Sequence, residues 1–246
     1  MTRPEPQLVV EFVGPPGAGK STAAALLTKS LESRGWSCGS REELTDLRSP
    51  RLLRYGRLAG FYLRRPSEFR AAVRLGSAAS SPTPLQRAQG LKYVSLWSFR
   101  FTRARDQGWD VLILDQGIVQ SAWSLLLRGS WRDDMVQSAV SRAILATGFR
   151  YVLVYLDLAV DLAAKRIAQR PTMASRFDHL DPTETARQLS VEGQRLEQLF
   201  GGVAQATGAA NCRVDAAKSP AEISSHIEHF IEGWLPGTPR AAVRAS

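Results

Sequence analysis

The residues of this chain best placed to do chemistry lie in the segment from Gly14 to Ser21, which reads GPPGAGKS. Its outer glycines, its lysine and its serine fill the fixed positions of G-x-x-x-x-G-K-[ST], in which a glycine-rich turn wraps backbone N–H groups around phosphate oxygens. Lys20 would neutralise the outer phosphates of ATP, and the Ser21 hydroxyl would be one ligand of Mg²⁺. The predicted ATP-binding residues are Gly14, Pro15, Pro16, Gly17, Ala18, Gly19, Lys20, Ser21 and Thr22.

The flanks of this loop have the patterns that a phosphate-binding loop needs. Residues 8–13 (LVVEFV) form a strand-like run, and residues 22–27 (TAAALL) are mostly good helix formers with one apolar face. The positive end of that helix would point at the phosphates. The alternative interpretation is an ordinary glycine-rich turn ahead of a helix.

A second candidate residue follows the most clearly apolar strand. Residues 109–114 (WDVLIL) predict a buried strand that delivers Asp115 at its carboxyl end, which is the edge where an open parallel sheet binds ligands. From there the Asp115 carboxylate could reach Mg²⁺ through water or activate the hydroxyl of an acceptor. Its alternative role is that of an acidic helix cap.

Arginines gather after a predicted strand at 151–156. Arg166 and Arg170 share one face of the next helix, and Arg176 follows in a polar loop at 171–181. Guanidinium groups beside a closing loop suit phosphoryl transfer, because negative charge develops on the migrating group and water must be excluded. Favourable contact with the helix dipole is the alternative explanation for arginines at a helix end.

The remaining pattern alternates strands with helices, which predicts an α/β fold with a doubly wound parallel sheet of about five strands, flanked by helices as in P-loop NTPases. Further strands are predicted at 36–40 and 211–214, and further helices at 50–64, 85–107, 118–128, 132–147, 159–169, 182–206 and 220–234. One domain is expected at 1–235, and a disordered tail at 236–246.

Composition narrows the class of protein and its expected location. The 246 residues carry a net charge of +9, and residues 41–105 hold 13 arginines and one lysine against four acids, a net charge of +10. This concentration predicts an anionic second substrate, or docking on a polyanion or an acidic membrane surface; a solvated arginine-rich face is the alternative. Two distant cysteines, an N-terminus unlike a secretory signal and no apolar run of membrane-spanning length predict a cytoplasmic protein.

These motifs resemble those of the thymidylate kinase-like branch of the nucleoside and nucleotide kinases, over nearly the whole chain. The shared features are the glycine-rich loop at 14–21 (the Walker A motif), SREE at 40–43, LILD at 112–115, the strand-to-lid segment at 156–178, VDA at 214–216 and SPAEI at 219–223. The resemblance implies a helical acceptor region at about 41–107 and a lid at about 170–181. It also implies that Lys20 and the lid arginines stabilise the transferred phosphate, and that the turn after the last strand lies against adenine.

Some residues depart from the pattern of that family. Gln116 stands where the family has an arginine, and Lys92 or Tyr93 falls near the place of the arginine that meets the acceptor base. Glu11 lies two residues earlier than the acid that borders the family's loop. Since the loop has no basic residue between its outer glycines, the family pattern assigns the catalytic arginine to the lid.

The predicted function is that of an ATP-dependent phosphotransferase, a kinase that moves the γ-phosphate of ATP to a small nucleotide, nucleoside or other small-molecule acceptor. The predicted catalytic residues are Lys20, Asp115, Arg170 and Arg176. The resemblance adds Arg166, Asp215 and Ala216 to the nucleotide site and Arg41, Glu42, Lys92 and Gln116 to the acceptor site; Ser21 and Asp115 would hold Mg²⁺.

Other functions stay open at this point. The main alternative is a P-loop ATPase or regulatory nucleotide-binding protein that uses its basic helical region to bind a partner or a membrane surface. Nucleic acid is not the expected partner, because the aromatic residues among the arginines at 97–105 have the spacing of core residues on a helix. A GTPase is disfavoured, since the chain has no N-K-x-D segment. A homodimer is a further prediction.

Overall fold

The computed structural model describes residues 8–44, 51–67, 69–70, 84–127, 131–169 and 176–237. Within these residues, five parallel strands form one central sheet. Their order across the sheet is β2-β3-β1-β4-β5, so the first strand lies in the middle. The fold is therefore α/β with an all-parallel sheet, as the alternation of strands and helices predicts. The strands are β1 (Leu8–Val13), β2 (Cys38–Ser40), β3 (Val111–Leu114), β4 (Arg150–Asp157) and β5 (Ala210–Asp215).

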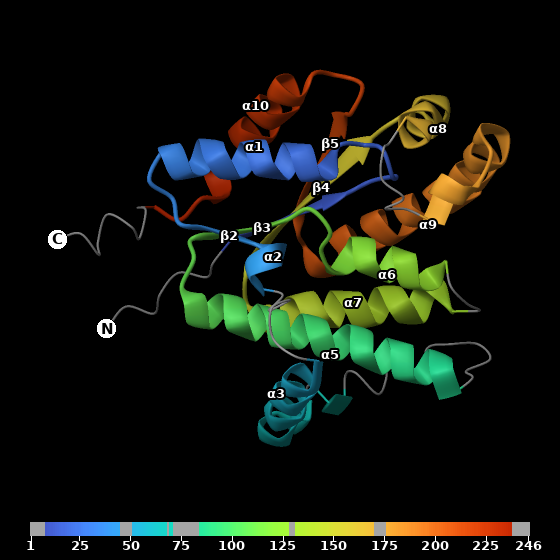
Figure 1. Ribbon diagram of the computed structural model, residues 1–246. Helices are drawn as coiled ribbons and strands as arrows, with labels where there is room; N and C mark the ends of the chain where they lie inside the picture. Colours follow the sequence, from blue (N-terminus) through green and yellow to red (C-terminus); the bar gives the residue numbers. More distant parts are fainter. Residues whose placement is uncertain are drawn as a thin grey trace.

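Helices cover both faces of this sheet (Figure 1). On one face α1 (Lys20–Ser33) lies beside α10 (Pro220–Ile231). The other face carries α5 (Pro84–Gln107), α6 (Ile118–Leu126), α7 (Asp133–Thr147) and α9 (Pro182–Thr207). At the periphery are α2 (Arg41–Leu44), α3 (Arg51–Arg64), which packs on α5, and α8 (Val160–Ala168), which packs on α9, together with the 3₁₀ turns η1 (Arg176–His179) and η2 (Glu232–Trp234).

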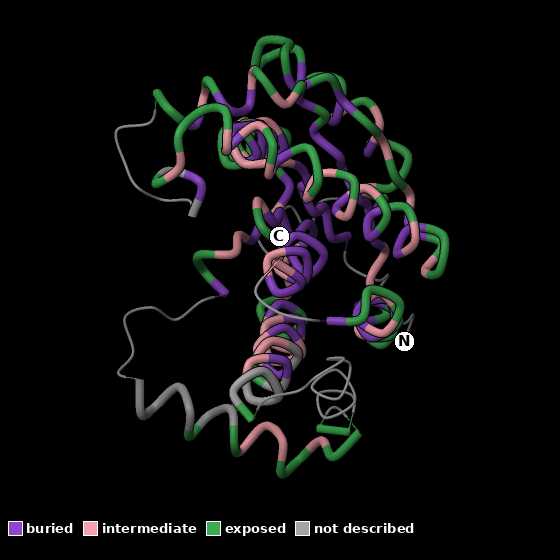
Figure 2. The backbone as a smooth tube through the Cα atoms, turned by 90° about the vertical axis from the view of Figure 1, so that its right-hand side faces the viewer, coloured by how far each residue is buried: buried purple, intermediate pink, exposed green. Residues whose placement is uncertain are grey.

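The strands are nearly continuous apolar runs because helices cover the sheet on both sides. Every residue of β1 and β3 is buried, and Figure 2 shows the buried stretches gathered toward the middle of the molecule. Glu11 departs from this pattern: it is a fully buried carboxyl group in the central strand. A buried ionisable group needs hydrogen-bond partners, so Glu11 marks a polar site inside the core.

Local sequence signals account for several helix ends. Ser219 and Glu222 form a reciprocal capping box at the start of α10, where the Ser-Pro pair predicts a helix. The Asp181 side chain accepts N–H bonds from the first turn of α9, which has a proline at its first position. Gly148, with φ of 68°, ends α7 in the left-handed conformation that glycine adopts most readily.

The structure differs from the sequence prediction at several boundaries. β2 begins at Cys38 rather than at residue 36, because the Trp36 N–H donates to the Leu31 carbonyl and closes the end of α1. The short helix α2 was not expected, since one turn is too short to show a hydrophobic period. The last helix ends at Ile231 and continues only as a 3₁₀ turn. Residues 238–246 of the predicted tail lie outside the described residues.

Because the strands are parallel, their carboxyl ends share one edge of the sheet. The segments that leave the strands at this edge are the glycine-rich loop after β1, Arg41 after β2, Asp115 after β3, Leu158 after β4 and Ala216 after β5. This edge therefore collects the chemical groups that the sequence singles out.

Candidate functional site

The glycine-rich loop joins β1 to α1 and fits tightly against the end of β4 and against α8. A Cβ atom on Gly14 would lie 2.6 Å from the Leu156 carbonyl oxygen, so only glycine fits there. Gly17 has φ of 89°, and its Cβ would lie 3.2 Å from the Ala163 carbonyl oxygen. Gly19, the residue before α1, has φ of 84° and caps the helix with no side chain. The sequence therefore forms a turn whose backbone lies next to the positive end of a helix.

Lys20 is the first residue of α1, and its side chain folds back over the loop. Its ammonium group donates hydrogen bonds to the carbonyl oxygens of Gly14 (2.7 Å) and Pro15 (2.8 Å). The side chain is buried, so its charge is only weakly screened by water. Phosphate oxygens are stronger acceptors than these carbonyls because they are charged. The loop thus holds a cation where a phosphate group could bind.

The next residue, Ser21, links the loop to the end of β3. Its hydroxyl donates a hydrogen bond of 2.9 Å to the Asp115 carboxylate. A hydroxyl and a carboxylate are the oxygen ligands that Mg²⁺ prefers, and this ion usually keeps several water or phosphate ligands. Among the described residues, no group of three or more His, Cys, Asp and Glu could hold a metal ion. The two side chains therefore fit an Mg²⁺ that shares its other ligands with phosphate and water.

Arg41 lies on the other side of the Asp115 carboxylate. Its Nε atom is 3.3 Å from the second carboxylate oxygen, and its Nη1 atom donates to the side-chain oxygen of Gln116 (2.8 Å). The structure brings these three predicted residues together at the edge of the sheet. Gln116 stands where the resembled family has an arginine, and here its amide oxygen orients a neighbouring arginine.

The nucleotide residues predicted after β4 and β5 also meet at the loop. Arg166, on α8, donates to the carbonyl oxygens of Gly17 (3.3 Å) and Ala216 (3.0 Å). The Ala216 N–H in turn donates to the Asp157 carbonyl oxygen (2.7 Å). The Asp215 carboxylate accepts from a backbone N–H two residues later and so shapes the turn after β5. Arg166 thus connects the phosphate-binding loop with the turn predicted to lie against adenine.

Other predicted residues are not brought into this cluster. Lys92 is exposed on α5, whereas the hydroxyl of its neighbour Tyr93 donates to the Ile118 carbonyl at the start of α6. Glu42 is exposed on α2, and Thr22 is exposed in the first turn of α1. Arg170 lies outside the described residues. For Arg176, the structure describes only the backbone, at the start of η1.

The sequence prediction did not assign Glu11 or Gln120 to the site, but both lie behind the loop. The Glu11 carboxylate accepts from the Gln120 backbone N–H (2.9 Å) and from the Tyr151 hydroxyl (2.7 Å). The Gln120 side-chain oxygen accepts from the Gly14 N–H (2.9 Å). Burial raises the pKa of Glu11 to about 7, even though these hydrogen bonds favour the charged form. The signal in the sequence was the one acid within the apolar strand at 8–13.

Arg100, on α5, is a third residue that the sequence prediction left out of the site. Its guanidinium group lies over the Trp97 ring, 4.6 Å from the ring centroid. Burial, and then the charge of Arg41, lower the pKa of Arg100 to about 10. Arg100 therefore lies close enough to Arg41, the partner of Asp115, for the two positive charges to repel, which favours an anionic group near them.

A cavity of about 540 Å³ lies between α3 and α5, within the predicted acceptor region. Arg65 donates to the Thr102 hydroxyl at its wall and lies 5.4 Å from the centroid of the Phe61 ring. The cavity is lined by Gly60, Phe61, Arg64, Arg65, Phe99, Thr102, Arg103 and Asp106. None of these residues belongs to the cluster around Lys20 and Asp115.

No protein-family model matches this chain, and no curated protein matches it either. Within the described residues, no helix is long and apolar enough to cross a membrane.

Glu11 should make the stability of the protein depend on pH. Its folded-state pKa lies above its unfolded value of 4.5, so the stability that it confers is complete below pH 4.5 and is lost as pH rises to about 7. Glu11→Gln cannot ionise, so its free energy of unfolding relative to wild type should rise by roughly 2–3 kcal/mol between pH 5 and pH 8. Urea denaturation at both pH values measures this difference.

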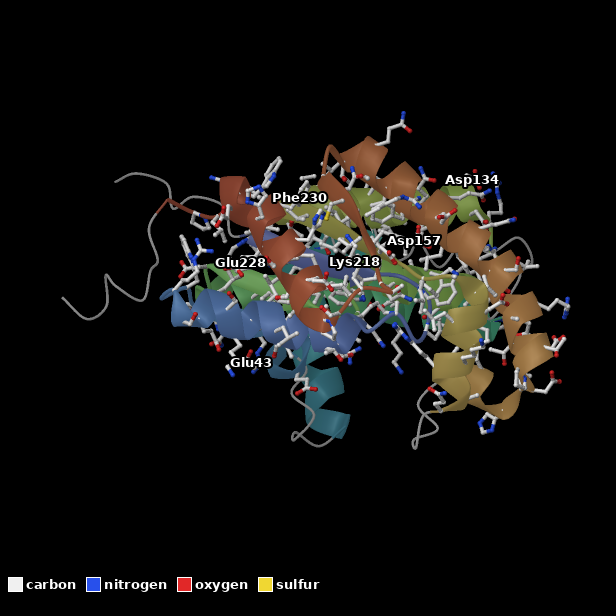
Figure 3. All side chains as sticks on the ribbon, turned by 90° about the horizontal axis from the view of Figure 1, so that it is seen from above. Glu43, Asp134, Asp157, Lys218, Glu228 and Phe230 are labelled. Atoms are coloured by element: carbon white, nitrogen blue, oxygen red, sulfur yellow. The ribbon has the colours of Figure 1, made fainter. Side chains whose placement is uncertain are left out.

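Glu228→Gln is the matched control for this prediction. Glu228 lies between α10 and α1, where Ser30 and then Arg34 lower the pKa of its carboxyl group (Figure 3). The Glu228 carboxyl group therefore titrates at a lower pH than the range in which Glu11 titrates. An equal difference between Glu11→Gln and wild type at pH 5 and pH 8 would show that Glu11 does not titrate in this range.

Proposed function

We propose that this protein is an ATP-dependent kinase of the P-loop type, which transfers the γ-phosphate of ATP to a small acceptor. The observation that carries the proposal is the hydrogen bond from Ser21 to Asp115. It joins the glycine-rich loop to the end of the neighbouring strand, the two places from which P-loop enzymes hold Mg²⁺. The sheet order and the position of the loop between β1 and α1 are compatible with that fold.

In this proposal each residue of the site has a defined task. Backbone N–H groups of the loop and Lys20 bind the β- and γ-phosphates, and Lys20 exchanges its carbonyl partners for phosphate oxygens. Mg²⁺, held by Ser21 and Asp115, would neutralise charge on the phosphates. Arg166 keeps the loop next to the turn after β5, where adenine is proposed to lie. The lid arginines Arg170 and Arg176 stay predicted catalytic residues.

The acceptor is proposed to bind on the other side of Asp115. Arg41 lies on this side, and Arg100 is close enough for their charges to interact, so an acceptor with a phosphate or carboxylate group would fit better than a neutral one. In this proposal the Asp115 carboxylate accepts a hydrogen bond from an acceptor oxygen and takes up its proton. Gln116, which accepts a hydrogen bond from Arg41, borders the proposed acceptor site, and the role of the exposed Glu42 stays a prediction.

A panel of nucleosides, nucleotides and sugar phosphates, supplied with ATP and Mg²⁺, tests the proposed function. We expect one acceptor class to stimulate ADP release and to yield a phosphorylated product, which mass spectrometry detects. ADP release that no small acceptor stimulates, but that anionic lipid or a protein partner does, would favour the ATPase alternative. The arginine-lined cavity between α3 and α5 is the observation that favours the ATPase alternative. The cytoplasmic location and the homodimer stay predictions.

Arg41→Ala is expected to weaken acceptor binding more than it slows the reaction. The guanidinium group offers charge-assisted hydrogen bonds, whose loss corresponds to a rise of roughly 10- to 100-fold in the acceptor KM with a smaller change in kcat. Arg34→Ala, at the end of α1 where the arginine pairs with Glu228, is the matched control. An unchanged acceptor KM in Arg41→Ala would remove this residue from the acceptor site.

A further inference from the structure

A chain of three buried hydrogen-bonding groups connects the core to the phosphate-binding loop. The Glu11 carboxylate in β1 accepts from the backbone N–H of Gln120 in α6, and the Gln120 side chain accepts from the N–H of Gly14. Gly14 is the first residue of the loop. The position of the loop therefore depends on how firmly Glu11 holds the start of α6.

The start of α6 is built around the Glu11 carboxylate. Gly117, which precedes the helix, offers no side-chain cap, and a Cβ atom there would lie 2.2 Å from the Glu11 carboxyl carbon. Glu11 takes the place of that cap: hydrogen bonds from the backbone N–H groups of Ile118 and Val119 also favour its charged form. The Glu11 carboxyl group, which is negatively charged when it ionises, therefore lies behind the loop that is proposed to bind phosphate.

Among the described residues, the titratable groups that interact with this carboxylate include two phenols. Tyr151 on β4 donates its hydroxyl to Glu11, and Tyr93 on α5 lies close enough for the charge of Glu11 to affect it. Burial raises the pKa values of both phenols further above their ordinary value, so both stay neutral at physiological pH. The helix α6 contributes backbone N–H groups and the uncharged amide of Gln120. Glu11 is therefore the group of this cluster that changes charge near pH 7.

We infer that Glu11 is a positioning residue for the phosphate-binding loop, and that binding of a nucleotide to the loop is coupled to the uptake of a proton by Glu11. This inference rests on the proposed function. Nucleotide phosphates bring negative charge to the loop and so disfavour the ionised carboxylate behind it. The proton comes from solvent, binds a carboxylate oxygen of Glu11, and returns to solvent when the nucleotide leaves.

Thermodynamic linkage gives the direction of the effect. If the nucleotide raises the affinity of Glu11 for a proton, the proton must raise the affinity for the nucleotide by the same factor. Nucleotide binding should therefore weaken as pH rises through the range in which Glu11 ionises. Since burial raises the pKa of Glu11 to about 7, the effect falls within the usual range of measurement.

The matched variants separate the charge of Glu11 from its hydrogen bonds. Glu11→Gln keeps an oxygen for the Gln120 N–H and offers an N–H to the Tyr151 oxygen, but it cannot take up a proton. Gln120→Ala removes the bond to Gly14 and leaves the Glu11 carboxylate in place. Glu228→Gln makes the same chemical change on α10, where the Glu228 carboxylate contacts Ser30 and Arg34 at the end of α1 (Figure 3).

Isothermal titration calorimetry with Mg²⁺·ADP tests the coupling. Each variant is titrated at pH 7 in two buffers of different protonation enthalpy, which reports the protons taken up. Wild type and Glu228→Gln should take up more protons than Glu11→Gln; the phosphate groups of ADP titrate alike in all three, so the difference isolates Glu11. Between pH 6 and pH 8 the affinity of wild type should fall roughly fivefold more than that of Glu11→Gln.

Gln120→Ala provides the test of positioning. It should bind Mg²⁺·ADP about tenfold more weakly, because the Gly14 N–H loses its buried acceptor, but it should still take up the proton. A purely structural role for Gln120 would lower stability without changing the affinity of the folded protein, and this result would overturn the positioning role.

Two results separate this inference from the proposed function. If wild type binds Mg²⁺·ADP but takes up no more protons than Glu11→Gln, the coupling is wrong and the nucleotide site stands. If wild type does not bind Mg²⁺·ADP, both are wrong. Should Glu11→Gln fail to fold, ¹³C NMR of glutamate-labelled wild type follows the Glu11 carboxyl directly: its pKa should rise on addition of Mg²⁺·ADP, and an unchanged pKa overturns the coupling.

Discussion

Lys20→Ala is expected to abolish nearly all phosphoryl transfer, with kcat/KM for ATP falling by roughly 10²–10³-fold. The Lys20 ammonium group is buried in the loop, 2.7 Å and 2.8 Å from the carbonyl oxygens of Gly14 and Pro15. A positive charge in a poorly solvated site stabilises the developing charge of a transferred phosphate far more than one in water. Steady-state kinetics with the acceptor found in the panel measures the loss.

The fold should survive this change, because the hydrogen bonds of the ammonium group to Gly14 and Pro15 lie within the loop itself. Lys29→Ala is the matched control, since Lys29 is an exposed lysine on the same helix. Circular dichroism and urea denaturation check that both variants are folded. Normal phosphoryl transfer by folded Lys20→Ala would show that the reaction does not take place at this loop.

The parts of the fold that the sequence predicts well are those set by local chemistry. The apolar run at 8–13 and the glycine-rich loop after it give β1 and the start of α1, because buried strands need apolar residues and the turn needs glycine. Ser219 and Glu222 mark the start of α10, because the capping box involves residues only three apart. Such signals do not depend on the order of the strands in the sheet.

The parts that the sequence does not predict depend on contacts between distant residues. Glu11 and Gln120 are 109 residues apart, and they meet because the middle strand of the sheet lies beside the start of α6. From the sequence alone, Glu11 is an isolated acid in an apolar strand. Its partners, and therefore its raised pKa, follow from the packing of β1, β4 and α6.

The contacts on the acceptor side of Asp115 also depend on residues that are distant in the sequence. The sequence places Arg41, Asp115 and Gln116 after strands, but the contacts among them require β2 and β3 to be neighbours. Arg100 was not predicted, because its place in a helix gives no sign that it faces Arg41. The lid arginines depend on the conformation of residues 170–181, so their catalytic role stays a prediction.

The carboxylate of Asp115 is a more specific test of the proposed kinase than the loop, because slow ATPases and regulatory nucleotide-binding proteins would also need Lys20. Asp115 lies between the Ser21 hydroxyl and the Arg41 guanidinium group, so it borders both the phosphate side and the acceptor side. Asp115→Asn keeps the size of the side chain and an oxygen that can accept from Ser21. It loses the negative charge and the ability to take up a proton.

We therefore expect Asp115→Asn to bind ATP without Mg²⁺ as wild type does, to require a higher Mg²⁺ concentration for turnover, and to lose roughly 10²–10⁴-fold in kcat at saturating Mg²⁺. Asp134→Asn is the control, because Asp134 is an exposed acid on α7 that pairs with Arg132. If higher Mg²⁺ restores full transfer, Asp115 acts only through the metal ion. If kcat is unchanged throughout, Asp115 does not activate the acceptor, because no charge at Asp115 is then needed for its phosphorylation.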